Sequence, residues 1–334
     1  MWRRRLAAVL LAVVLVVAAG GAAAVTYLAQ LSDAFDSQAV RIPQAFPEAS
    51  LRPAAAEPRP DSRSPINILL LGTDTVAADG DPLVAGSQGS RTDAMMLLHL
   101  PADRQQLHVM SIMRDLWTNI PGYGEAKINA AYAHGGAPLT VRVVEEMFGT
   151  RIDHVAVMDF EGFGSLTESL GGVEITVDQA FDSSHLPGRR FNAGPQLMNG
   201  QEALAFVRER YAYSDGDYQR VRNQQEFIRA ALAKFLTMET LTNPGRISDV
   251  VSKTAPYVAV DEGLNAAGVA GLALELRDLR ADDIKMFTLP TAGIGTSDDG
   301  QSIVLRDEAA IAAVGRALRG DTLDQYLRAL PAGG

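Results

Sequence analysis

The chain has 334 residues, of which 47% are hydrophobic and 21% are charged, with a formal net charge of −10 and no cysteine. The acidic balance argues against nonspecific binding of nucleic acid, which depends on a basic surface. The lack of cysteine excludes disulfides, cysteine-ligated zinc, iron–sulfur clusters and thiol chemistry. The length allows one large or two small domains, each with a well-buried core.

The N-terminus combines a basic start with a long apolar run. Three arginines, Arg3 to Arg5, precede an almost uncharged stretch from Leu6 to Leu31. This stretch exceeds the roughly 20 residues that span a bilayer, and arginines before a span favour a cytoplasmic N-terminus. We therefore predict a cytoplasmic tail at 1–5, a transmembrane signal anchor at 6–31 and an extracytoplasmic remainder of a single-pass cell-membrane protein. A cleaved signal peptide is the alternative, because small residues at 18–24 offer a cleavage site.

A linker and a first strand follow this segment. Residues 32–64 are rich in Pro, Ala, Ser and charge, which predicts a partly extended extracytoplasmic linker before a domain at 65–325. Ile66–Leu71 is a short apolar run ended by Gly72, which is typical of a buried strand. A polar, glycine-rich loop is expected over 77–90.

Two further strands are predicted at 94–100 and 107–113, joined by a turn sequence at 101–104. In a hairpin the start of one strand lies beside the end of the other, so we expect Asp93 and Arg114 at one edge of the sheet. Asp74 joins them if the first strand ends on the same side.

The rest of the chain alternates helices and strands. Helices are predicted at 138–148, 161–170, 200–206, 217–235, 264–277 and 308–318, and strands at 154–158, 173–177, 284–289 and 302–305. The alternation indicates an α/β fold, and the hairpin makes a mixed central sheet flanked by helices the expected arrangement. In the helix at 217–235, Arg220 and Gln224 lie on the flank of an apolar stripe, from which polar groups can point into a cleft.

Several of these residues have the chemistry of a phosphate site. Asp74 and Asp93 offer the oxygen ligands that Mg²⁺ prefers, although aspartates at such positions also cap turns. Guanidinium groups bind phosphate through two parallel hydrogen bonds, and the candidate arginines are Arg91, Arg114, Arg208, Arg210 and Arg220. A solvated charged face has the same composition, because acids are as numerous as arginines between 201 and 229.

Six segments in order together resemble the LytR-CpsA-Psr family over roughly residues 65 to 240. They are Gly72-Thr73-Asp74, Ser90-Arg91-Thr92-Asp93, Ser111-Ile112-Met113-Arg114-Asp115, Lys127-Ile128-Asn129, the run from Ala203 to Arg210, and Gly216-Asp217-Tyr218-Gln219-Arg220, with the match extending through Gln224-Gln225. The resemblance implies an extracytoplasmic phosphotransferase that moves a glycopolymer from a polyprenyl-pyrophosphate carrier in the membrane to peptidoglycan.

The resemblance also implies roles for the matched residues. Asp74 and Asp93 would hold Mg²⁺, with Mn²⁺ as an alternative. Catalytic roles are expected for Arg91, Asp93, Arg114, Arg208, Arg210 and Arg220, and substrate binding for Lys127, Asp217, Gln224 and Arg222. Asn223 stands where the family often has arginine, with Arg222 beside it. Asp115 or Asp217 is the candidate general base.

Other readings of the same residues stay open. The candidate lining of an apolar groove for the prenyl chain is Phe148, Phe160, Phe163, Leu166 and Leu170, each of which also suits core packing. With water as the acceptor, the protein would be a pyrophosphatase of the same lipid, and without turnover it would be a polyprenyl-phosphate-binding envelope regulator. The sequence names neither the glycopolymer nor the acceptor hydroxyl nor an oligomeric state.

Overall fold

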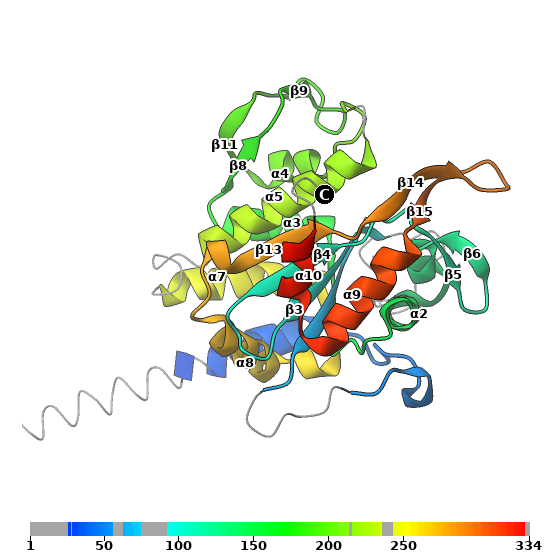
Figure 1. Ribbon diagram of the computed structural model, residues 1–334. Coiled ribbons are helices and arrows are strands. Elements are labelled where there is room, and N and C mark those ends of the chain that lie inside the picture. The colour runs from blue at the N-terminus through cyan, green and yellow to red at the C-terminus, as the bar shows by residue number, and fades with distance from the viewer. Residues whose placement is uncertain are drawn as a thin grey trace, which may run out of the picture.

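A computed structural model of the chain describes residues 26–27, 29–55, 63–74, 92–213, 216–235 and 243–330. A seven-stranded sheet runs through the molecule in the order β1-β12-β7-β2-β3-β4-β13 (Figure 1). Its strands are β1 (Val40–Arg41), β12 (Val258–Val260), β7 (His154–Asp159), β2 (Ile66–Thr73), β3 (Thr92–Leu100), β4 (Leu107–Ser111) and β13 (Ile284–Thr288). Pairs β1–β12, β7–β2 and β4–β13 are parallel and the others antiparallel, which confirms the predicted mixed sheet.

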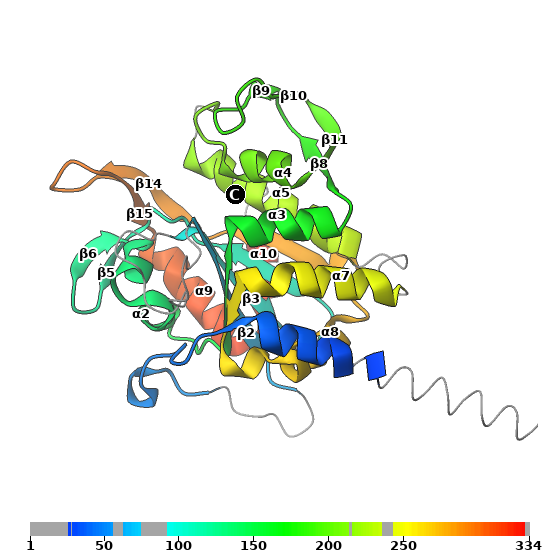
Figure 2. The same ribbon diagram turned by 180° about the vertical axis from the view of Figure 1, so that it is seen from behind.

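Strand β2 explains how the sheet is covered on both faces. Its side chains alternate, so that Leu69 and Leu71 pack with helices α2 (Ala130–Phe148) and α9 (Glu308–Gly320). Leu70 points the other way and packs with helices α5 (Asp217–Phe235) and α8 (Ala266–Leu276). Figures 1 and 2 show α2 and α9 on one side of the sheet and α8 on the other.

A second apolar core lies above the sheet, at the top of Figure 1. It combines β8 (Val173–Val177), β11 (Gly194–Met198), α3 (Phe160–Ser169) and α4 (Gly200–Arg208) with α5 and α7 (Pro244–Thr254). Two short strands, β9 (Phe181–Asp182) and β10 (Arg190–Phe191), pair at its outer edge. Helices α3 and α4 approach backbone to backbone, since a Cβ atom added to Gly200 would lie 2.7 Å from the Gly164 carbonyl oxygen.

Some elements begin earlier than predicted or were missed. Helix α2 starts at Ala130 because its first turns precede a kink at Gly135 and Gly136, after which Pro138 is tolerated near the start of the second half. The sequence analysis missed β5 (Trp117–Ile120), β6 (Gly124–Lys127), β14 (Thr291–Thr296), α7 and α10 (Leu323–Ala329). Strand β15 (Ser302–Arg306), which pairs with β14, was predicted.

The predicted extended linker is wrong for residues 39–52, which belong to the folded domain. Residues 29–38 are helical, and β1 pairs with β12 at the sheet edge. Ile42 is fully buried, and Arg52 forms a buried ion pair with Glu145 of α2, with Nη2 2.7 Å from Oε1. Composition alone indicated a partly extended linker because only a few apolar side chains, among them Ile42, Ala45 and Phe46, and one buried ion pair hold the segment.

Within the described ranges, no helix combines the length and the apolar character needed to cross a bilayer. Most of the predicted signal anchor lies outside these ranges, and so do the predicted loop at 77–90 and Arg91.

The Arg52–Glu145 pair yields a stability prediction. Glu145 is buried and also accepts a hydrogen bond from the Ile152 backbone nitrogen, so Arg52→Ala would leave a buried carboxylate without its main partner. We expect this change to lower the free energy of unfolding by about 3 kcal/mol. Urea unfolding followed by circular dichroism measures the effect.

The matched control is Arg142→Ala on α2, the helix that carries Glu145. This change removes a half-exposed ion pair with Glu146 and should lower the free energy of unfolding by no more than about 0.5 kcal/mol. Equal losses of unfolding free energy in Arg52→Ala and Arg142→Ala would contradict a special contribution of the Arg52–Glu145 pair to stability.

Candidate functional site

The sheet brings the predicted carboxylates, Asp74 and Asp93, and Arg114 to the same end of neighbouring strands. Strands β2 and β3 are antiparallel with Thr73 opposite Thr92, so Asp74 and Asp93 lie at the same end. Arg114 follows β4 and its Nη1 binds Asp93 Oδ1 directly. The hairpin prediction for Asp93 and Arg114 is therefore confirmed, and Asp74 joins the same edge.

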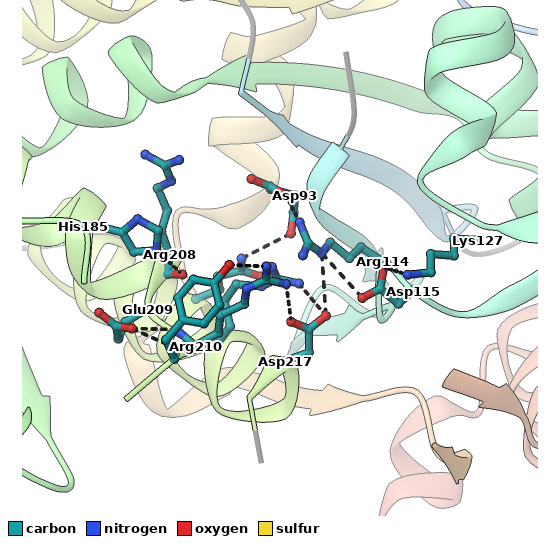
Figure 3. Close-up of polar contacts among 12 residues, drawn as sticks. Asp93, Arg114, Asp115, Lys127, His185, Arg208, Glu209, Arg210 and Asp217 are labelled. Carbon is teal, nitrogen blue, oxygen red and sulfur yellow. Dashed lines mark hydrogen bonds and ion pairs between the residues drawn. The ribbon is translucent and has the colours of Figure 1, made fainter. Parts of the chain in front are cut away.

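Asp217, the first residue of α5, is the centre of an arginine cluster (Figure 3). Its carboxylate lies 2.9 Å from Arg220 Nη2, 3.6 Å from Arg114 Nε and 3.7 Å from Arg210 Nη1. These residues come from the end of β4, the segment after α4 and the first turn of α5. Three guanidinium groups that are distant in sequence thus share one carboxylate.

Asp115 forms the other half of this centre. Its Oδ1 lies 3.4 Å from Lys127 Nζ at the end of β6. Burial, followed by a hydrogen bond with Asp217, raises the pKa of Asp115. For Asp217, burial opposes ionisation, but that same hydrogen bond and the charges of Arg220, Arg114 and Arg210 leave its pKa below the ordinary value. The pKa of Asp115 therefore lies above that of Asp217, so Asp115 is the more basic carboxylate of the pair.

Two arginines of the cluster have donor groups that make no hydrogen bond among the described residues. The Nε groups of Arg114 and Arg220 are buried and have no hydrogen-bond partner among the described residues. Arg220 is only 4% exposed, and burial together with the charge of Arg114 lowers its pKa. Buried donors without a hydrogen bond are costly, so a hydrogen bond from these groups to an anion would be favourable.

Glu209 holds the neighbouring arginines in place, a role that the sequence analysis missed. The buried carboxylate of Glu209 accepts hydrogen bonds from the backbone nitrogens of Ser184, Arg210 and Tyr211. Backbone and hydroxyl donors of Ser184 outweigh burial and lower its pKa. The signal was an acid between two arginines, Arg208 and Arg210, directly after a helix.

An apolar cavity of about 460 Å³ opens beside the cluster. Asp93, Arg114, Arg208, Arg210 and Arg220 line its charged side, and Arg208 lies over the Phe160 ring, 4.4 Å from the centroid. Phe160, Phe163 and Leu166 line its apolar part, as predicted for a groove. Phe148 and Leu170 do not, because each is buried in a core cluster.

The remaining predicted residues divide between the site and its surroundings. Gln224 lines the cavity, and its Nε2 donates to the Asp93 carbonyl at 3.4 Å. Arg222 does not join the cluster, since its Nε donates to Gln219 at 3.0 Å on another side of α5. Asn223 is buried and donates to the Phe206 carbonyl, a structural contact.

The carboxylates suit a hard cation that shares its shell with a substrate. Mg²⁺ is commonly held by one or two carboxylates, with waters and phosphate oxygens completing the octahedron. Asp74 and Asp93 at one sheet edge fit this requirement. Over the described residues there is no cluster of three or more His, Cys, Asp or Glu side chains with metal-binding geometry.

A second buried carboxyl faces the cavity at the end of β7. Asp159 caps helix α3, with Oδ1 accepting from the Gly162 nitrogen at 2.6 Å, and its Oδ2 has no hydrogen-bond partner in the described part of the chain. Burial raises the pKa of Asp159 to about 6.

Comparison with known proteins gives consistent sequence relatives. LcpB of Corynebacterium glutamicum, named a probable cell wall biosynthesis protein, is 35% identical over 76% of this chain, and the cell wall biosynthesis protein LcpA is 30% identical over 72%. The chain spans only 61% and 53% of the lengths of these two proteins. The regulatory protein MsrR of Staphylococcus aureus is 30% identical over 71% of this chain and 69% of its own length.

Solved structures share the fold. TagV of Bacillus subtilis superposes with a TM-score of 0.65 at 22% identity, covering 78% of this chain and 97% of TagV. A structure described as TagT bound to LIIa-WTA gives 0.61 at 25% identity, covering 80% of this chain and 96% of TagT.

A family model, LytR_cpsA_psr, matches residues 26–320, which include every residue of the site described above. The chain belongs to the LytR-CpsA-Psr family.

Proposed function

We propose that this protein transfers a glycopolymer from a polyprenyl-pyrophosphate carrier to peptidoglycan. The observation that carries the proposal is the arginine cluster beside an apolar cavity, in which the buried Nε atoms of Arg114 and Arg220 have no hydrogen-bond partner among the described residues. A ligand that satisfies both parts has a dense negative charge joined to a long hydrocarbon, which describes a lipid pyrophosphate.

The comparisons support this substrate class. Relatives at 30% and 35% identity are named for cell wall biosynthesis, and a structural neighbour is described as bound to LIIa-WTA. The cavity of about 460 Å³ accommodates part of a prenyl chain, and the rest would extend beyond it.

In the proposed reaction, a hydroxyl oxygen of peptidoglycan attacks the phosphorus that carries the glycopolymer. A new phosphorus–oxygen bond forms, the bond to the bridging oxygen breaks, and polyprenyl phosphate leaves with the electron pair. Arg114, Arg210 and Arg220 stabilise the charge that develops on the phosphate oxygens, because they are already oriented and need little reorganisation.

Asp115 is the proposed general base for the attacking hydroxyl. Its raised pKa makes it a better proton acceptor than an ordinary carboxylate, and Asp217, which the arginines keep ionised, is a weaker one. Lys127, 3.4 Å from Asp115, would stabilise the carboxylate before it accepts the proton.

Mg²⁺ held by Asp74 and Asp93, with Mn²⁺ as a substitute, would neutralise phosphate charge during transfer. The proposal also includes a single-pass membrane location with an extracytoplasmic site, because the lipid donor resides in a membrane and the apolar run at 6–31 suits an anchor.

The first prediction concerns Arg220. Its removal takes away a buried donor to the transferred phosphate, so Arg220→Ala should lower kcat/KM roughly 100-fold. The assay follows the full chain in detergent with a labelled lipid-pyrophosphate saccharide, Mg²⁺ and peptidoglycan fragments, and measures label joined to glycan. Arg229→Ala is the matched control, because Arg229 lies on the same helix but binds Glu226 at the surface.

Attachment of label to glycan that is equally fast in Arg220→Ala and Arg229→Ala would refute the role of the cluster. Release of polyprenyl phosphate without attachment would identify a pyrophosphatase instead. Tight donor binding without any release would identify a lipid-binding regulator.

The second prediction concerns pH. A general base acts only when deprotonated, so activity should fall as the pH drops through the raised pKa of Asp115. Asp115→Asn should remove both most of the activity and this acid limb from the residual rate. A kcat/KM profile between pH 4.5 and 8, a range chosen around ordinary and raised carboxyl pKa values, measures the change.

Asp159→Asn is the control for the pH profile, because Asp159 also titrates, with a pKa of about 6. Asparagine caps helices as well as aspartate does, so the fold should be retained. Persistence of the acid limb in Asp159→Asn supports the assignment to Asp115, and its loss there would transfer the limb to Asp159.

The third prediction concerns the metal. Asp93→Asn removes one proposed ligand, so the Mg²⁺ concentration for half-maximal activity should rise at least about tenfold while saturating Mg²⁺ restores part of the rate. Titration of activity with Mg²⁺ tests this. An unchanged midpoint would exclude Asp93 as a ligand.

A further inference from the structure

Helix α8 presents an apolar surface to solvent. No charged residue occurs from Ala266 to Leu274, yet none of the residues of the helix is buried. Val269 is 39% exposed and Leu274 is 63% exposed. We define the outer face of α8 as Ala267, Val269, Ala270, Ala273 and Leu274, all of which are exposed. Contiguous apolar surface of this kind usually marks a contact with a partner or a membrane.

The N-terminal part of the chain leads directly to this face. Asp36, in the helix at 29–38, accepts a hydrogen bond from the Ala266 nitrogen at 2.9 Å, at the start of α8. Arg41 Nη1 donates to the Leu264 carbonyl at 3.1 Å. Figures 1 and 2 both show the N-terminal helix beside α8. In the sequence, residues 6–25 ahead of that helix carry no charge, so the most apolar part of the chain directly precedes the helix that contacts α8.

The inner side of α8 connects the same region to the cavity. Leu276 packs in a cluster with Leu70 and Ile228, and both of these residues also line the cavity. The apolar part of the cavity therefore contacts the same hydrophobic cluster that α8 covers. The charged part of the cavity lies at the strand ends that carry Asp93 and Arg114.

We propose that the outer face of α8 rests in the interfacial layer of the membrane that holds the N-terminal segment. This inference rests on the membrane anchoring included in the proposed function. We choose a lipid surface as the partner of this face because the apolar run at 6–31 extends into the helix that contacts Ala266. Arg277, which follows α8, is exposed and forms an ion pair with Asp278 at 3.3 Å. In the proposed orientation its guanidinium would meet the lipid phosphates.

Site-specific fluorescence tests the contact. The chain has no cysteine, so Leu274→Cys in the full chain can be labelled with an environment-sensitive dye at that position alone. Ile294→Cys on β14 is the matched control, because Ile294 is 64% exposed against 63% for Leu274 and lies at a distance from α8 (Figure 1). The protein is inserted into vesicles of phosphatidylglycerol and phosphatidylethanolamine that contain a nitroxide-labelled lipid.

We expect the dye at residue 274 to emit at shorter wavelength and to be quenched several-fold more by the nitroxide than the dye at residue 294. Equal, weak quenching at the two positions in vesicles that carry the protein on flotation would overturn the contact while leaving the anchor intact. Failure of the protein to float would overturn the anchor, and the inference with it. A blue shift that appears without vesicles would show that a second copy covers the face, and would also overturn it.

A double substitution that introduces charge tests whether the membrane contact matters for turnover. Val269→Glu with Leu274→Glu places two carboxylates on the outer face without disturbing a buried residue. Transfer from a donor embedded in vesicles should fall several-fold, while transfer from the same donor in detergent should be unchanged. An equal loss in both assays, or no loss in either, would contradict a role of the contact in turnover. Neither result would affect the proposed transferase activity, which the Arg220→Ala assay tests.

Discussion

The sharing of Asp217 by Arg114, Arg210 and Arg220 is the interaction on which the site depends. Guanidinium groups at this separation repel one another, and the repulsion is strongest for Arg220, which is almost fully buried. The ionised carboxylate of Asp217 offsets that repulsion in part, and the Nε donors of Arg114 and Arg220 have no hydrogen-bond partner in the part of the chain that the structure describes. In the proposed reaction, a phosphate group of the lipid donor would complete the charge balance.

The fold keeps this charged region apart from the apolar one. Glu209 fixes the segment that carries Arg210, and the close contact of Gly164 with Gly200 holds α3 against α4. The walls of the cavity can therefore remain apolar up to the edge where the arginines begin. A ligand with charge but no hydrocarbon would satisfy the arginines alone, and one with hydrocarbon but no charge would satisfy only the walls. The proposed selectivity for an amphiphile rests on the adjacency of the two regions.

Local patterns predicted much of this arrangement. The contact between Asp93 and Arg114 follows from strand alternation and a turn sequence, because a hairpin fixes which ends are neighbours. The phase of α5 was harder, since Val221, Ile228 and Phe235 pack into three different clusters and leave no single apolar stripe. The expectation for Arg222 came from the resemblance alone, and its side chain lies on another side of α5 from Arg220. The role of Glu209 was also invisible, because an acid between two arginines resembles a solvated charge pattern until its burial is known.

The fold of residues 39–52 has a mechanical consequence. Because β1 joins the sheet and Arg52 forms an ion pair with Glu145 of α2, the chain between the N-terminal helix and the domain is bound to the domain and does not act as a flexible linker. A segment bound in this way keeps the helix at 29–38 at a fixed position relative to the domain. The distance between the arginine cluster and that helix is then a property of the fold. In the proposed membrane location, a glycan strand would have to come to the site, because this part of the chain cannot lengthen to reach it.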